Sequence, residues 1–442
     1  MTKYVKSQEA LPSNLHLWDP YPTQTAVRET RVMDFFPTSS IESSDTVAFT
    51  IPAMQKYMLD TVEVVTEIRV LTANGDAPPE HNNVSTVPYL AAALWRNVNV
   101  TIGNSSITQS FDNSYSMFKF WDTVLHNHQG SHAFLKRREG LILDACGSKA
   151  HSENVVYYPV APAAEAPVPA VVNKQGRHRA ERIQRGHKVC LVSDFNVSLF
   201  KQSKLLPSNM EISVHLTKNF SEFILLSAAN NTDKVVFDRV SLRCTFQRPT
   251  DMVLSLIEER LARDNAIYHA DKSMLTFHSL TNGDGEVTID NVFTGTLPYF
   301  FIYGVQDRAA FGRMRHRNPF SLHKMKSTSV HVNGQPHFVT PAEAMEHDDT
   351  YMYDMFVDQC GRLNQGDSLV NHHYEVYPAM ACDLTQDKTQ NQSRMNLSKS
   401  GTVRITVSFD DEIPEAENRV LMVLAYYDQM IEISKDREVS FI

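Results

Sequence analysis

The chain has 442 residues, of which 42% are hydrophobic and 21% charged, and its formal net charge is −9. This composition is typical of globular proteins, and since no run of about 18 apolar residues occurs, no transmembrane helix is predicted. The net negative charge argues against a protein that binds nucleic acid over its whole surface. Because one hydrophobic core rarely serves so long a chain, the length predicts two domains of roughly 200 residues each.

Strand patterns begin in the first half of the chain. Apolar residues alternate with polar ones over 62–70 and 98–102, and the same period of two returns over 212–216 and 240–246. Such alternation is typical of strands with one buried and one exposed face. In the second half, Val330 and Val332 lead into Asn333-Gly334, a strong hairpin signal, and 281–286 is expected to form another turn.

The last forty or so residues constrain the fold most. Residues 403–409 alternate as a half-buried strand does, and an acidic loop is expected at 410–418. Residues 420–427 are apolar on both faces, as expected of a strand in the centre of a packed sheet, and 428–429 are expected to interrupt it before 430–433. Short strands separated by turns and long loops indicate an all-β sandwich or barrel.

Few segments predict helices. Residues 250–264 are the best of them, with Thr250 or Asp251 as the cap, and their place near mid-chain predicts a linker helix between two β-domains. An acidic helix over 341–360 is expected to cover a sheet edge. Residues 115–126 predict a third helix.

One segment has a biased composition. Four prolines among alanines and valines precede a basic run, and residues 159–188 together predict a long, exposed, mobile loop inserted in a β-domain. The basic residues of the run are Lys174, Arg177, Arg179, Arg182, Arg185 and Lys188. These six are the candidates for contact with nucleic acid or an acidic partner, with an affinity that falls as salt rises. The alternative is that the run is a solvated loop without such a contact. The shorter basic clusters 136–138 and 313–317 have the same two interpretations.

Candidates for chemistry are weak. His126, His128 and His132 come nearest to a metal cluster, but no Cys or carboxylate lies at a fitting distance in the sequence, so loop histidines are the preferred interpretation. The same holds for 347–349 and 372–373. No nucleophile elbow, phosphate-binding loop, dinucleotide fingerprint or zinc-protease motif occurs. We therefore predict no catalytic residues, no cofactor and no metal, and a protein that is not an enzyme.

The cysteines predict neither disulfides nor a metal site. Cys146, Cys190, Cys244, Cys360 and Cys382 are far apart and odd in number. We expect buried free thiols that behave as small apolar residues, in a chain folded in a reducing compartment.

Short motifs in a fixed order are similar to one protein family. The chain resembles the capsid proteins of Maverick/Polinton elements and related small double-stranded DNA viruses of animals. The matching motifs are Pro22-Thr-Gln-Thr25, Ile51-Pro52, Leu199-Phe-Lys-Gln-Ser-Lys-Leu-Leu-Pro207, Asn265-Ala-Ile-Tyr268, Arg317-Asn-Pro-Phe320, Val332-Asn-Gly334, Cys382-Asp-Leu-Thr385 and Ala425-Tyr-Tyr-Asp-Gln-Met-Ile-Glu-Ile433. Each is weak by itself, and their order and spacing together are the specific signal.

The resemblance implies an all-β chain of two tandem jelly rolls, each an eight-stranded sandwich, with a few short helices. The expected division is an N-terminal arm at 1–22, a first jelly roll at 23–246 that carries the long loop 159–188, and a second at 247–442 that begins with the linker helix. The arm, with Leu15, Leu17 and Trp18, is expected to order on a neighbouring copy.

The implied function is a hexon-like major capsid protein of an icosahedral virion, assembled in the nucleus or cytoplasm of the host cell. Its implied partners are two further copies in a pseudo-hexagonal trimer, neighbouring capsomers, penton or minor capsid proteins, and packaged DNA through the basic loops. A minor, penton-type capsid protein is one alternative. A receptor- or glycan-binding sandwich with Trp95, Trp121 or exposed tyrosines as its platform is another.

Overall fold

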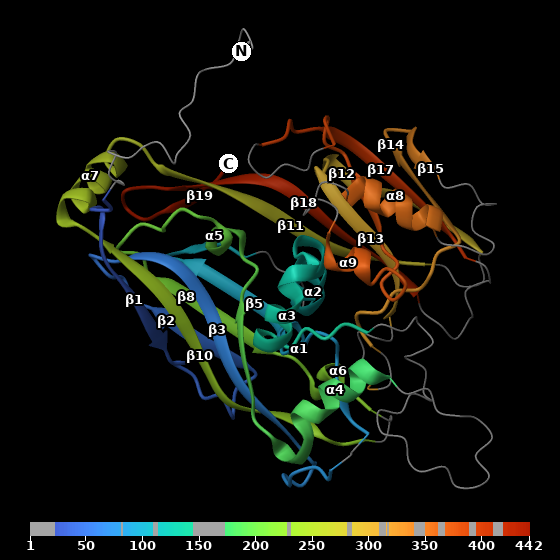
Figure 1. The fold of residues 1–442 in the computed structure, drawn as a ribbon. Helices are drawn as coiled ribbons and strands as arrows, with labels where there is room; N and C mark the ends of the chain where they lie inside the picture. The colour runs from blue at the N-terminus through green and yellow to red at the C-terminus, as the bar shows by residue number, and fades with distance from the viewer. Residues whose placement is uncertain are drawn as a thin grey trace, which may run out of the picture.

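The computed structural model describes residues 23–80, 83–108, 114–144, 173–227, 231–280, 285–308, 315, 318–339, 350–360, 367–388, 395–409 and 419–442. Within these residues the protein is mostly β-structure, and two groups of strands lie on either side of a central helix, α2 (Figure 1).

The first group of strands forms two four-stranded antiparallel sheets, ordered β1-β10-β3-β7 and β2-β8-β5-β6. Alternating apolar side chains of both sheets fill the space between them, as the period of two predicts. The strands are β1 (Val27–Phe35), β2 (Thr46–Ile51), β3 (Met58–Leu71), β5 (Trp95–Ile102), β6 (Ser105–Ser106), β7 (Val189–Asp194), β8 (Ile212–Lys218) and β10 (Lys234–Pro249), beside a separate short pair β4 (Ser85–Thr86) and β9 (Leu225–Leu226).

The second group repeats this arrangement with the orders β11-β18-β13-β16 and β12-β17-β14-β15. A further strand, β19, pairs with the end of β18 beyond the residues that pair with β13. The strands are β11 (Ala266–Ser279), β12 (Glu286–Thr296), β13 (Phe300–Asp307), β14 (Ser327–Val332), β15 (Gln335–Val339), β16 (Met380–Asp383), β17 (Ser400–Ser408), β18 (Arg419–Ile433) and β19 (Val439–Phe441).

The two groups share one topology. Counting eight strands of each group in chain order, with β4, β9 and β19 left aside, one sheet has the order 1-8-3-6 and the other 2-7-4-5 in both groups. An antiparallel two-sheet sandwich of eight strands connected in this way is a jelly roll. The described part of the chain therefore contains two jelly rolls in tandem, which confirms the predicted fold class.

Short helices fill the connections. They are α1 (Leu90–Ala93), α2 (Tyr115–His126), α3 (His132–Arg138), α4 (Lys174–Ile183), α5 (Ser198–Lys201), α6 (Ser221–Ile224), α7 (Asp251–Leu261), α8 (Thr350–Cys360) and α9 (Leu369–His372), with 3₁₀ turns η2 (Gln129–Ser131) and η4 (Gln184–Gly186). Among these described helices, none has the length and apolar character needed to cross a membrane.

Several predicted elements are confirmed. α2 has the predicted bounds, α7 lies within 250–264, and α8 ends at Cys360 and packs against β16, the edge strand of its sheet. The hairpin between β14 and β15 turns at Asn333 and Gly334, whose φ values of 52° and 78° are those that a two-residue type I′ turn requires.

Two predictions are wrong. β18 is not interrupted at Asp428 and Gln429, because both residues keep their pairing with β11, and their side chains are half-buried where β18 has passed the end of β13. The basic run is not a loop over its whole length, because 174–183 forms α4. The side chain of Asn173 caps this helix by accepting a hydrogen bond from the Gly176 amide at 2.8 Å.

Other predictions lie outside the described residues: the arm at 1–22, most of the turn at 281–286, the start of the helix at 341–349 and the loop at 410–418. The boundary between residues 246 and 247 stays a prediction. β10 itself continues to Pro249, directly before α7.

Candidate functional site: the interface between the two jelly rolls

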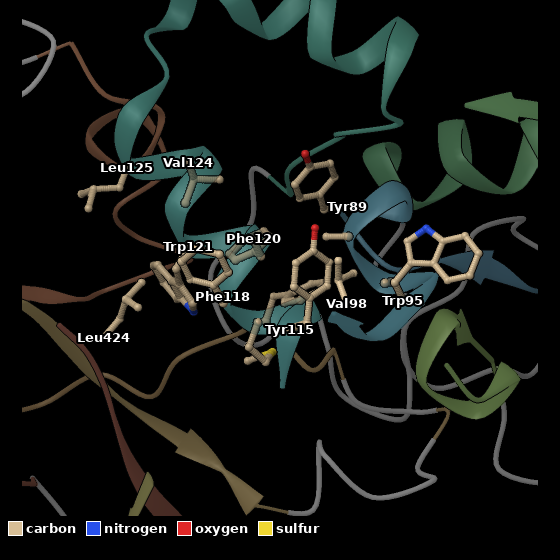
Figure 2. Close-up of a cluster of buried hydrophobic side chains, with 14 of the residues drawn as sticks. Tyr89, Trp95, Val98, Tyr115, Phe118, Phe120, Trp121, Val124, Leu125 and Leu424 are labelled. Atoms are coloured by element: carbon tan, nitrogen blue, oxygen red, sulfur yellow. The ribbon is translucent and has the colours of Figure 1, made fainter. Parts of the chain in front are cut away.

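α2 occupies the centre of the molecule. Every residue from Tyr115 to Leu125 is buried, and Figure 2 shows its aromatic side chains among those of neighbouring elements. The sequence explains half of this placement, because the apolar residues of α2 form one broad face that packs in the core, whereas Lys119, Asp122 and Thr123 lie on the other face and are buried among polar partners. The ring of Phe120 stacks on Phe320 with centroids 4.3 Å apart, and Trp121 meets the edge of Tyr377 at 6.1 Å.

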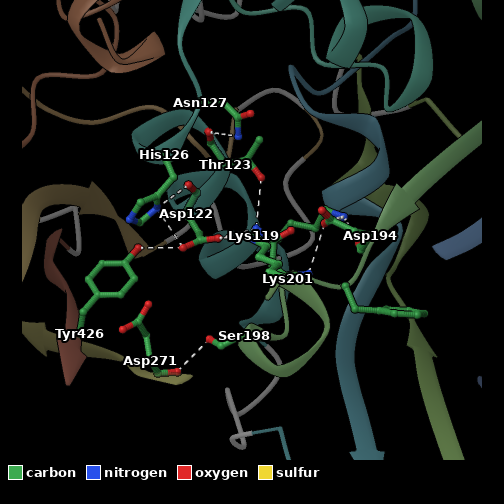
Figure 3. A network of polar contacts seen from close by, with 12 residues as sticks. Lys119, Asp122, Thr123, His126, Asn127, Asp194, Ser198, Lys201, Asp271 and Tyr426 are labelled. Carbon is green, nitrogen blue, oxygen red and sulfur yellow. Dashed lines mark hydrogen bonds and ion pairs between the residues drawn. The ribbon is translucent and has the colours of Figure 1, made fainter. Parts of the chain in front are cut away.

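Around α2, a network of polar side chains joins the two jelly rolls (Figure 3). The Asp122 carboxylate of α2 accepts hydrogen bonds from Lys201 Nζ at 2.8 Å and from Asn196 Nδ2 at 2.6 Å, both in the first jelly roll. It also accepts one from the hydroxyl of Tyr426 on β18 at 3.2 Å. His126 Nδ1 lies 3.2 Å from the same carboxylate. One carboxylate thus connects both halves of the chain.

A second cluster lies one turn earlier on α2. The Lys119 ammonium is 1% exposed and lies 3.7 Å from a carboxylate oxygen of Glu139 and 3.7 Å from one of Asp194. It also donates to the backbone carbonyl of Asp194. The hydroxyl of Tyr89 donates to Glu139. The buried cation therefore has anionic and neutral partners, as a buried charge requires.

The surroundings shift the pKa values of these groups. Burial alone would raise the pKa of Asp122, but Lys201 and His126 outweigh it and hold this pKa well below its usual range. Burial alone would lower the pKa of His126, but the Asp122 carboxylate outweighs it and raises this pKa above its usual value. Burial raises the pKa of Glu139 against the opposing effect of Lys119. Both shifts favour the charged form of the Asp122–His126 pair.

The geometry of the network suits a structural contact between the two jelly rolls rather than a catalytic site. The crevice beside it, lined by residues that include Ser198, Asp271 and Gln429, has a volume of about 40 Å³. This accommodates a few water molecules, whereas sites for small molecules enclose roughly 300–1,000 Å³. The carboxylate of Asp122 accepts from four neighbours at once and has no free side toward the crevice for a substrate.

The three histidines that come nearest to a metal cluster in the sequence each have a different neighbour in the structure. His126 pairs with Asp122, His128 is bridged through its backbone to Ser368, and the His132 ring meets His373 edge-on with centroids 5.9 Å apart. Within the described ranges, no three His, Cys, Asp or Glu side chains converge as metal ligands would. Residues 347–349 lie outside these ranges. His372 Nε2 lies 2.6 Å from an Asp367 carboxylate oxygen.

Arg179, one of the six predicted contact residues, is a structural residue. Its side chain is 1% exposed, and its guanidinium donates to the carbonyls of Thr86 at 2.8 Å and Ile142 at 2.7 Å and pairs at 2.8 Å with Asp144, which is fully buried. A desolvated guanidinium with these acceptors cannot reach a phosphate group. The prediction of a nucleic-acid or partner contact is therefore wrong for Arg179, because α4 turns this residue toward the protein.

The other five predicted contact residues surround Arg179 at the surface. Lys174 is exposed, and Arg182 donates to the carbonyl of Lys136 at 3.3 Å. The remaining three each face a carboxylate: Arg177 that of Glu181 at 3.1 Å, Lys188 that of Asp238 at 3.7 Å, and Arg185 that of Glu80. A contact with DNA or a partner through these five stays a prediction.

Some residues of the shorter basic clusters also form ion pairs within the protein. Arg315 is buried and lies 3.4 Å from a carboxylate oxygen of Glu222, and the rest of 313–317 is outside the described residues. Arg138 pairs with Glu63.

The burial of the cysteines and tryptophans tests two further predictions, buried free thiols and a tryptophan platform for glycans. Cys244, Cys360 and Cys382 are buried free thiols, as predicted, and Cys146 lies outside the described residues. Cys190 is exposed, so the prediction is wrong there, because the alternation of β7 turns Cys190 to the outer face. Trp95 and Trp121 are 2% and 0% exposed, so neither forms a glycan platform.

Sequence reasoning missed the network around Asp122. Two charged residues, Lys119 and Asp122, in a helix rich in aromatic and aliphatic residues were the available signal. Their partners Lys201 and Tyr426 lie 79 and 304 residues from Asp122, so no local pattern could identify them.

Known proteins are similar to this chain in structure rather than in sequence. No family model matches it, and a search of curated proteins finds no match. A chain of the Sputnik virophage has 12% identity and a TM-score of 0.65 over 99% of this chain and 93% of that one. A chain of the PBCV-1 virus capsid has 11% identity and a TM-score of 0.60, over 96% and 98%. The mavirus major capsid protein has 10% identity and a TM-score of 0.53, over 100% and 96%.

These similarities cover both jelly rolls and the interface between them. At such low identities they show a shared fold, the double jelly roll, over nearly the full length of each protein.

Proposed function

We propose that this protein is the major capsid protein of a double-stranded DNA virus and builds an icosahedral shell. The observation that carries the proposal is the full-length similarity to chains of viral capsids, which includes both jelly rolls in the same order. The interface supports a structural role, because its buried charges are paired and its crevice is too small for a substrate.

The proposed capsomer is a homotrimer. Two jelly rolls of one topology lie side by side in each chain, so three chains around a threefold axis present six similar sandwiches and a pseudo-hexagonal outline. Such an outline tiles a shell with few kinds of contact. Shell subunits require obligate interfaces of roughly 2,000 Å² or more, which the long connections between strands are expected to supply.

A major rather than a minor capsid role is favoured by the second jelly roll, because a single-sandwich protein needs only about half this length. The narrower assignment to Maverick/Polinton elements rests on the ordered sequence motifs. The proposals of penton partners and of assembly inside the host cell rest on the same resemblance. A glycan-binding role loses the two tryptophans of its predicted platform, since both Trp95 and Trp121 are buried.

The mass of the purified protein in solution tests this proposal. Light scattering after size-exclusion chromatography is expected to give three times the chain mass of 50.1 kDa, unchanged on tenfold dilution. A stable monomer at all concentrations would contradict the capsomer proposal. Glycan-array binding by such a monomer would favour the receptor-binding alternative instead.

A further inference from the structure

α7 carries an apolar face that the described part of the chain leaves uncovered. Met252 is 75% exposed, the largest fraction among the described large apolar side chains, and Leu256 is 54% exposed. The two residues are four apart, so they lie next to each other on one face of the helix. Leu261 on the opposite face is buried and holds α7 to the body of the protein.

The apolar face is confined to the first two turns of α7. Two side chains of the last turn are charged and already paired with residues just beyond the helix, Glu259 with Arg263 and Arg260 with Asp264. An apolar segment can therefore pack on this face of α7 only near the N-terminal end of the helix.

The N-terminal segment leaves the described structure at that end. The Thr250 amide, at the N-cap of α7, donates to the Ala26 carbonyl at 2.9 Å, and β1 begins one residue later, opposite Pro249. Figure 1 shows β1 running up to α7. The described chain thus begins at Thr23, three residues before the contact of Ala26 with the first turn of α7.

Length and composition both fit this segment to the apolar face. The eight residues from Ala26 back to Trp18 span up to about 26 Å when extended, at roughly 3.3 Å per residue. Leu256 lies only six residues along the helix from Thr250, roughly 9 Å at 1.5 Å per residue. Four of the eight residues 11–18 are apolar, namely Leu11, Leu15, Leu17 and Trp18.

We propose that the outer face of α7, formed by Met252 and Leu256, is the docking site for residues 11–18 of the same chain. The short tether gives this segment a high effective concentration at the face of α7. The same segment of another copy lacks this advantage and would need additional contacts to compete. This differs from the sequence-based expectation that the arm orders on a neighbouring copy. It goes beyond the proposed function, because it concerns the single chain before any assembly.

Disulfide trapping in the full-length protein tests the proposal. In a background with Cys146 and Cys190 replaced by serine, Leu17→Cys is combined with Leu256→Cys and oxidised under mild conditions. The matched control combines Leu17→Cys with Lys56→Cys, since Lys56 Nζ lies 3.8 Å from an Asp251 carboxylate oxygen and is equally within reach of the tether but off the apolar face.

The proposal predicts that the 17–256 pair forms an intramolecular cross-link at least tenfold faster than the 17–56 pair. Equal rates for the two pairs would overturn it, because they indicate a tethered segment with no preferred site. Cross-links between chains, seen as a species of twice the mass, would also overturn it in favour of docking on a second copy.

Proteolysis gives an independent readout. Leu256→Asp is expected to speed chymotryptic cleavage within the docked segment, after Leu15, Leu17 and Trp18, severalfold, whereas Arg260→Asp, on the charged turn, leaves the rate unchanged. Equal cleavage rates in the two variants and the unaltered protein, with folding verified by circular dichroism, would contradict docking at Leu256.

Discussion

Replacing Arg179 by alanine separates a structural role from a nucleic-acid contact at this position. The guanidinium binds the Thr86 and Ile142 carbonyls and the Asp144 carboxylate, with both charged side chains at most 1% exposed. Removing one partner of a buried ion pair costs roughly 3–5 kcal/mol, because the other charge stays buried without its counter-charge. We expect Arg179→Ala to lower the free energy of unfolding by this amount.

The assay is thermal unfolding of Arg179→Ala beside Arg177→Ala, a matched control on the same helix. For a unit of 150–250 residues, each kcal/mol shifts Tm by roughly 2–4 °C, so Arg179→Ala should lower Tm by at least about 6 °C. The Arg177–Glu181 pair is exposed, and its loss should cost only about 0.5 kcal/mol. The double change Arg179→Met with Asp144→Leu should recover most of the loss, since it removes both buried charges.

Two results would refute this reasoning. Equal Tm values for Arg179→Ala and Arg177→Ala would show that the buried pair contributes nothing. An unchanged Tm together with a weaker, less salt-dependent affinity for double-stranded DNA would restore the contact role that the basic run first indicated.

Three further predictions concern the second jelly roll and the interface. Val423 is fully buried in β18, so Val423→Asp should abolish soluble, folded protein, whereas Ile267→Asp at a position 45% exposed should not; circular dichroism of the two variants decides. Because Asp122 raises the pKa of folded His126 above the unfolded value of about 6.5, the stabilisation by this pair is complete below pH 6.5 and is lost as the pH rises through the raised pKa. The Tm difference between the unaltered protein and His126→Gln should therefore shrink from pH 6 to pH 8, and a difference that grows would contradict the sign. Trp121→Ala should cost about 3–5 kcal/mol in unfolding experiments, and a stable variant that loses glycan binding would instead support the receptor alternative.

Local patterns made several of the strands and three of the helices predictable. The alternation in β3, β5, β8, β10 and β17 reports which face of each sheet is buried, and the Asn-Gly pair defines the turn between β14 and β15 by its φ angles alone. Both signals lie within a few neighbouring residues, so one sequence suffices to detect them.

The elements that escaped prediction depend on distant partners. α4 buries Arg179, and Asp144, 35 residues earlier, supplies the counter-charge that this buried cation requires. The continuity of β18 through Asp428 depends on its pairing with β11, more than 150 residues away in the chain. The polar network has the same origin, since Asp122 accepts a hydrogen bond from Tyr426, which lies 304 residues away in the chain.

Electron microscopy of the purified protein tests the central claim most directly. Negative-stain averages are expected to show trimers with a pseudo-hexagonal outline, in which six sandwiches of similar size surround the threefold axis. Isolated two-lobed monomers, or oligomers without this outline, would contradict the assignment as a capsid building block.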